Sequence, residues 1–119
     1  MRRGVHLLIG AFGILAYSYL LSLILEIPAN TLLMGFFATL FGSVMPDAIE
    51  PARTWSHRGL GHSRRMLRLA GWLFALTAVL GLLQIAVPDL SVSYIVSAFF
   101  LGYGLHLLAD SVTPAGLPD

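Results

Sequence analysis

The stretch LLIGAFGILAYSYLLSLIL, residues 7–25, decides the fold class. It runs for nineteen residues without a charged side chain. A helix of about 20 apolar residues is long enough to cross the ~30 Å hydrocarbon core of a bilayer. Arg2 and Arg3 precede it, as basic residues precede the apolar region of a signal peptide, but that region is typically 7–15 residues and ends at a small-residue cleavage site. The sequence therefore predicts a retained transmembrane helix.

The composition of the whole chain agrees with a membrane protein. Charged residues make up 11% of the 119 residues and apolar residues 57%, whereas soluble domains carry roughly 25% charged residues. The net charge is only +1, so no overall field attracts nucleic acid and no such partner is expected. The absence of cysteine excludes disulfides and thiolate metal ligands.

Three further apolar runs follow the first. Leu69–Val87 has nineteen residues and Val92–Ala109 eighteen, but Leu32–Met45 has only fourteen. This short run either spans with Pro28 and Pro46 partly in the interface or forms a shorter, protein-covered helix, and we favour a span. The predicted fold is all-α: a single domain, residues 1–119, with four transmembrane helices at about 6–26, 31–46, 66–87 and 92–110.

The basic residues predict the orientation. All seven are arginines, and they lie before the first span or between the second and third: Arg2, Arg3, Arg53, Arg58, Arg64, Arg65 and Arg68. Because positive charge stays on the cytoplasmic side, we expect both termini and the polar loop from Pro46 to Arg65 to face the cytoplasm. The expected location is the inner, or plasma, membrane.

Two local patterns predict how the helices begin and pack. Ser63 is suited to cap the third helix. The pairs Ala38/Gly42 and Ala98/Gly102 are each four residues apart, which gives small-residue faces that allow close helix contact in lipid.

On this topology the histidines and half of the acids gather at one membrane level: His6, Asp47, Glu50, His57, His62, His106 and Asp110. His106 and Asp110 are four residues apart and share a helix face. Ionisable groups in or beside a span are costly and by default mark a functional site. Imidazole and carboxylate groups are ligands suited to zinc, manganese or iron.

Each of these residues also has a plainer interpretation. His57 alone reads as a solvated loop histidine, Asp47 as a turn residue, and Glu50 as an ion-pair partner of Arg53. The arginines serve equally well as anchors for lipid headgroups. Convergence from four separate segments of the chain is what favours a common site.

Three motifs resemble those of a known family. MPDAIE (45–50), HRGLGHS (57–63) and GYGLHLLADSVTPAG (102–116) resemble, in this order, the signatures of the YdjM-like family. Its members are small integral membrane proteins described as metal-dependent hydrolases, one of them regulated by LexA. The resemblance implies functional roles for His6, Asp47, His57, His62, His106 and Asp110.

The chain departs from the family pattern at two positions. The second acid, Glu50, lies one position later than in the family, and Gly61 stands where the family has threonine. The first departure puts the role of Glu50 in question, and the second removes a hydroxyl beside His62.

The predicted function is a membrane-embedded, metal-dependent hydrolase that acts on a phosphoester or a lipid headgroup at the cytoplasmic face. The expected cofactor is a divalent metal, zinc before manganese or iron. Its predicted ligands are His57, His62, His106 and Asp110, with His6 and Asp47 completing the set or holding a second ion. Glu50 or Asp47 is the expected general base, and Arg58 is suited to bind a phosphate.

Three other functions are compatible with the sequence. A metal or proton carrier needs polar groups across the whole membrane, and the spans offer few. A haem protein with two axial histidines leaves the carboxylates without a role. A structural or regulatory membrane subunit uses only the arginines, in contact with anionic lipid. The sequence leaves the oligomeric state open.

Overall fold

The computed structural model describes residues 3–49, 60–83, 90–113 and 117, and within them it contains only helices and turns. The helices are α1 (Arg3–Ser22), α2 (Ala29–Ile49), α3 (Arg64–Leu83) and α4 (Leu90–Ser111), with a short 3-10 turn, η1 (Leu60–His62), before α3. The four α-helices have 20 to 22 residues, which is about 30 Å at 1.5 Å per residue. All four are long and apolar enough to cross a membrane, which confirms the predicted fold class.

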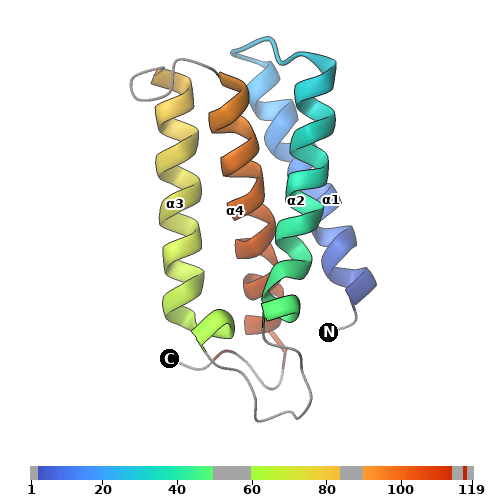
Figure 1. Ribbon diagram of the computed structural model, residues 1–119, viewed down its shortest axis with the longest axis vertical. Coiled ribbons are helices and arrows are strands. Elements are labelled where there is room, and N and C mark those ends of the chain that lie inside the picture. The colour runs from blue at the N-terminus through green and yellow to red at the C-terminus, as the bar shows by residue number, and fades with distance from the viewer. Residues whose placement is uncertain (1–2, 50–59, 84–89, 114–116, 118–119) are drawn as a thin grey trace.

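The helices alternate in direction (Figure 1). The beginnings of α1 and α3 and the ends of α2 and α4 therefore lie together at one end of the bundle. We call this the arginine end, because it carries all the described arginines: Arg3, Arg64, Arg65 and Arg68. As a consequence α2 and α4 run in the same direction.

The second helix is longer than its apolar run. α2 begins directly after Pro28 and continues through Pro46, which lies inside the helix, to Ile49. Proline has no N–H to donate to the carbonyl four residues earlier, here Gly42. Transmembrane helices tolerate such prolines because neighbouring groups satisfy the freed carbonyl. The fourteen-residue run thus sits inside a helix of 21 residues.

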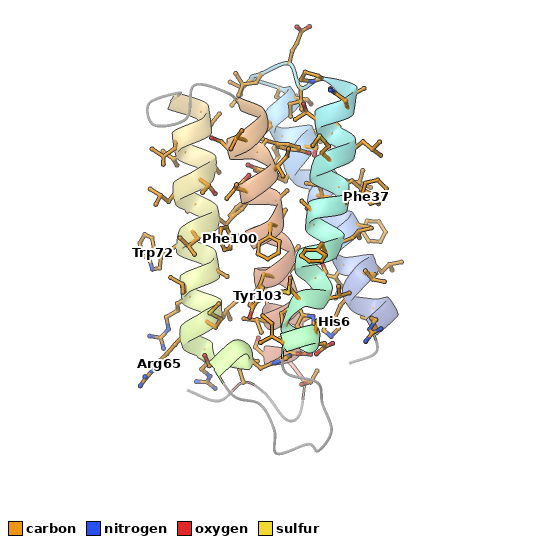
Figure 2. The ribbon with its side chains drawn as sticks, in the orientation of Figure 1. His6, Phe37, Arg65, Trp72, Phe100 and Tyr103 are labelled. Atoms are coloured by element: carbon orange, nitrogen blue, oxygen red, sulfur yellow. The ribbon has the colours of Figure 1, made fainter. Side chains whose placement is uncertain are left out.

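α4 is the central helix of the bundle. It packs against α1, α2 and α3, and half of its spanning segment is buried, compared with 11% of that of α3. Large apolar side chains point outward, as Phe37 and Trp72 show in Figure 2, with exposures of 61% and 75%. This is the arrangement expected in lipid, where the interior gains from close packing and the exterior stays apolar.

Two glycines bring the main chains of α2 and α4 into close contact. A Cβ atom on Gly42 would collide with the main chain of Phe99, and one on Gly102 with the main-chain oxygen of Thr39. The hydroxyl of Thr39 also donates to the carbonyl of Ala98 at 3.0 Å. The glycines of both predicted small-residue pairs therefore lie in this interface.

Hydroxyl groups tie α1 to α4 in the half of the bundle remote from the arginine end. The Oη–Oγ distance is 2.6 Å both for Tyr17–Ser97 and for Ser18–Tyr94. The two tyrosine rings stack with centroids 5.8 Å apart. These side chains are neutral, so they join helices without burying a charge.

α3 begins with the predicted cap. The N–H of Met66 donates to Oγ of Ser63 at 3.1 Å, which satisfies one of the free N–H groups of the first turn. The cap fixes where the chain enters the membrane after His62.

Candidate metal centre

His106 is the middle of a polar cluster at the arginine end. Its Nδ1 lies 2.5 Å from the main-chain oxygen of Ser43. A carbonyl only accepts, so Nδ1 carries the hydrogen and the neutral ring keeps its lone pair on Nε2. This Nε2 lies 3.4 Å from Oδ1 of Asp47 and 3.2 Å from Oδ2 of Asp110. A lone pair facing two carboxylate oxygens is repelled by them unless a proton or a metal cation lies between.

His62 reaches the same two carboxylates from the η1 turn. Its Nε2 is 3.1 Å from Oδ1 of Asp47 and 3.9 Å from Oδ2 of Asp110. The hydroxyl of Tyr103 donates to the carbonyl of Gly61 at 3.0 Å, so α4 holds the turn that carries His62. Figure 2 shows Tyr103 near the arginine end.

His6 enters from the first turns of α1 (Figure 2). Its Nε2 lies 3.4 Å from Oδ1 of Asp110, and its ring stacks on that of His106 with centroids 3.7 Å apart and planes inclined by 18°. Gly10, one turn further along α1, faces the side chain of Ser43 so closely that a Cβ atom would collide with its hydroxyl. The missing side chain lets α1 approach α2 and brings His6 to the cluster.

We call these five residues the His/Asp cluster: His6, Asp47, His62, His106 and Asp110. Four of their side chains are at most 4% exposed, and Asp47 is 27% exposed. Across the part of the chain that the structure describes, four buried side-chain atoms have no hydrogen-bond partner, and three of them belong here: His6 Nδ1, His106 Nε2 and Asp110 Oδ1. Each such atom costs about 1–3 kcal/mol, so their concentration is typical of a site that binds an ion.

The distances between these side chains approach those between the ligands of a small metal ion. Two groups of three residues, His6/Asp47/His106 and His62/His106/Asp110, place one ligand atom each within 4.8 Å of the others. Ligands about 2.0–2.1 Å from a tetrahedral zinc ion lie about 3.3–3.4 Å from one another. The separations around His106 and His62 are 3.1, 3.2, 3.4 and 3.9 Å.

The structure brings together five of the six residues that the sequence suggested as metal ligands. The sixth, His57, lies outside the described residues, as do Glu50 and Arg58. The contributions of the Ser43 carbonyl and the Tyr103 hydroxyl were missed. A main-chain acceptor leaves no mark in the sequence, and Tyr103 is separated from its partner Gly61 by 42 positions.

These features define a polytopic α-helical membrane protein with a buried group of histidines and aspartates, able to hold a metal, at one end of its bundle. The model of the YdjM inner membrane protein family matches residues 1–118. The chain therefore belongs to this family, as the three motifs had indicated, and is a multi-pass inner-membrane protein. Neither the curated proteins nor the solved structures contain a significant match.

Proposed function

We propose that the protein is a membrane-embedded, metal-dependent hydrolase whose metal centre is the His/Asp cluster. The observation that carries this proposal is the hydrogen bond from His106 Nδ1 to the Ser43 carbonyl. Ligating histidines typically donate their other ring N–H to such an acceptor, which fixes the tautomer and aims the free nitrogen. Here the free nitrogen is aimed at two carboxylates.

Charge supports a divalent ion. Asp47 and Asp110 together carry two negative charges beside three histidines that are neutral when they bind metal. A divalent cation cancels this charge, whereas two unpaired carboxylates in a buried site are costly. Mixed imidazole and carboxylate ligands favour zinc, with manganese and iron as the next candidates.

The centre opens on the side of Asp47, the only member of the cluster with substantial exposure. A divalent ion held in such a centre would act as a Lewis acid and would lower the pKa of a bound water to about 7. Within this proposal the protein excludes bulk water on the other sides and directs the substrate to the Asp47 side. Glu50 as general base and Arg58 as phosphate clamp lie outside the described residues and stay predictions.

The charge at the arginine end favours an anionic substrate. The described arginines at this end, Arg3, Arg64, Arg65 and Arg68, have exposed side chains, and the cluster is neutral once a divalent ion balances its two acids. Positive charge at the same end of the bundle as a neutral centre attracts phosphate groups. Because the helices end here, we propose a phosphoester at headgroup depth, a lipid or a smaller ester, on the cytoplasmic side.

Passage of an ion through the bundle is less well supported. In the described helices the half remote from the arginine end offers only neutral polar groups, namely hydroxyls and the amide of Asn30. The hydroxyls of Tyr17 and Tyr94 already bond to Ser97 and Ser18. An ion that left the cluster in this direction would meet no charged ligand. The carrier function therefore ranks second, and a purely structural subunit leaves the cluster unexplained.

The test begins with elemental analysis of the detergent-purified protein. Hydrolysis of a chromogenic phosphoester and of anionic phospholipid vesicles is then compared for native, metal-stripped and zinc-reloaded protein. We expect about one divalent ion per chain, with activity lost on stripping and restored on reloading. Asp110→Ala should abolish both metal and activity, with Arg65→Ala as a control for metal content. Activity that survives both stripping and Asp110→Ala would refute the proposed mechanism.

A further inference from the structure

We infer that the cluster holds a single ion through Asp47, His62, His106 and Asp110, and that His6 is a positioning residue. In this arrangement His6 holds the Asp110 carboxylate and makes no contact with the ion. The inference rests on the proposed function and specifies how the five residues divide their roles.

The stacked rings exclude His6 and His106 from the same ion. The lone pair of an imidazole nitrogen lies in the plane of its ring, and these two rings are 3.7 Å apart and nearly parallel. An ion about 2.0–2.1 Å from both nitrogens would lie far outside at least one ring plane. The rings of His62 and His106 instead meet at 63° with centroids 5.4 Å apart, so their lone pairs are able to converge.

Hydrogen bonding decides what His6 does instead. Its Nδ1 is buried and has no partner. If Nε2 were bound to metal, the neutral ring would carry its hydrogen on Nδ1 as a buried, unsatisfied donor, at a cost of about 1–3 kcal/mol. If Nε2 carries the hydrogen, it faces Oδ1 of Asp110 at 3.4 Å, and Nδ1 leaves only an unused lone pair. Unsatisfied donors are the rarer case in proteins.

A second ion beside His6 lacks ligands. His106 has one nitrogen bound to the Ser43 carbonyl, so its Nε2 serves one ion only. A second ion would then have His6 and carboxylate oxygens alone among the described residues. His6, Asp47 and Asp110 would be three residues, as many as a zinc site needs, but both carboxylates would be shared with the first ion. Only His6 would belong to the second ion alone, so the described residues favour one ion.

The two carboxylate oxygens of Asp110 therefore have different roles. Its Oδ1 faces His6, while its Oδ2 faces His106 and His62 at 3.2 and 3.9 Å. An N–H of His6 that points at one oxygen from 3.4 Å favours one rotation of the carboxylate, even without a full hydrogen bond, and so directs the other oxygen at the ion. Loss of such a supporting contact typically lowers metal affinity about 10–100-fold.

The experiment titrates metal-stripped, detergent-solubilised protein with Co²⁺ and measures stoichiometry, affinity and the visible ligand-field spectrum. The variants are His6→Gln, whose amide N–H replaces the donor, His6→Ala, which removes it, and His106→Gln as the matched loss of a ligand. Thermal melting and gel-filtration profiles verify folding. His6→Gln keeps a side chain of similar reach and so decides the outcome if His6→Ala does not fold.

We expect one Co²⁺ per wild-type chain, an unchanged spectrum in His6→Gln, and affinity about 10–100-fold lower in His6→Ala, with His6→Gln close to wild type. His106→Gln should lose the spectrum. Two ions in the wild type and one in His6→Gln, or a spectrum altered alike in His6→Gln and His106→Gln, would overturn the role of His6 and leave the metal centre standing. A wild-type protein that binds no Co²⁺ would overturn both.

Discussion

The imidazole of His106 is hydrogen-bonded to the main chain of Ser43, with Nδ1 2.5 Å from the carbonyl oxygen. Asp110 follows His106 by four residues on α4, and Asp47 follows Ser43 by four residues on α2. Because α2 and α4 run in the same direction, one further turn brings the two aspartates to the same level. This single contact therefore sets the register of the cluster.

Gly102, one turn before His106 on α4, allows the contact between His106 and Ser43 to form. Gly102 lies four residues before His106, and it approaches the main-chain oxygen of Thr39, which lies four residues before Ser43. Any side chain at Gly102 would separate the helices and move His106 from Ser43. The packing of the membrane-embedded part and the geometry of the His/Asp cluster are thus coupled.

Replacement of His62 should remove a ligand without disturbing the helix interface. His62→Ala is expected to lower zinc affinity by more than about 100-fold, above the range for loss of a supporting contact, while α2–α4 packing is retained. Competition with a chromogenic chelator measures the affinity. Arg65→Ala, an exposed change at the same end, serves as the control. Equal affinities in the two variants would remove His62 from the ligand set.

Gly102→Ala should destabilise the bundle by about 1–3 kcal/mol, because the added methyl group overpacks the interface with Thr39. Thermal unfolding in detergent measures the effect. The matched control is Gly71→Ala on α3, where nothing lies within 4 Å of the added atom; alanine there should be neutral or stabilising by up to about 1 kcal/mol. Equal stability of the two variants would contradict the close contact.

Tyr103→Phe removes the hydroxyl that bonds to Gly61. We expect a loss of about 0.5–1.5 kcal/mol and faster hydrogen exchange at residues 61–63, because the turn that carries His62 loses its tie to α4. Tyr19→Phe changes an exposed tyrosine of α1, 63% exposed, and should alter neither. Unchanged exchange in Tyr103→Phe would show that the turn is held by other contacts.

The hydrogen bond between Tyr17 of α1 and Ser97 of α4 should contribute little to stability despite its 2.6 Å length. A double-mutant cycle with Tyr17→Phe and Ser97→Ala is expected to give a coupling energy of about 0.6 kcal/mol, the average for bonds between membrane helices. Zinc affinity should stay at the wild-type value in all three variants, since both residues lie in the opposite half of the bundle. A changed affinity would indicate coupling between the two halves.

The arginines predict that both termini face the cytoplasm, and this orientation is open to direct test. A reporter fused after residue 119 should fluoresce as a cytoplasmic protein, and an alkaline phosphatase fusion at the same point should be inactive. A fusion in the connection between α1 and α2, near Glu26, should give the reverse result. Active phosphatase at the C-terminus would place the cluster on the opposite membrane face.

The sequence by itself determined the fold class and the membrane level of the site. Apolar run lengths gave four spanning helices because a bilayer imposes a minimum length, and helical connectivity then placed His6, His106 and Asp110 at one end. The spacing of His106 and Asp110 also fixed their contact, since residues four apart share a helix face.

Only the tertiary structure decided how the cluster is organised. The register of α2 against α4, the Ser43 carbonyl that sets the tautomer of His106, and the stacking of His6 on His106 all join residues that are distant in the chain. Their positions depend on how closely two helices pack. Glycine permits the close packing but does not specify the register of the helices. The sequence shows which histidines and aspartates reach one end of the bundle, but the directions in which their side chains point arise from packing between helices.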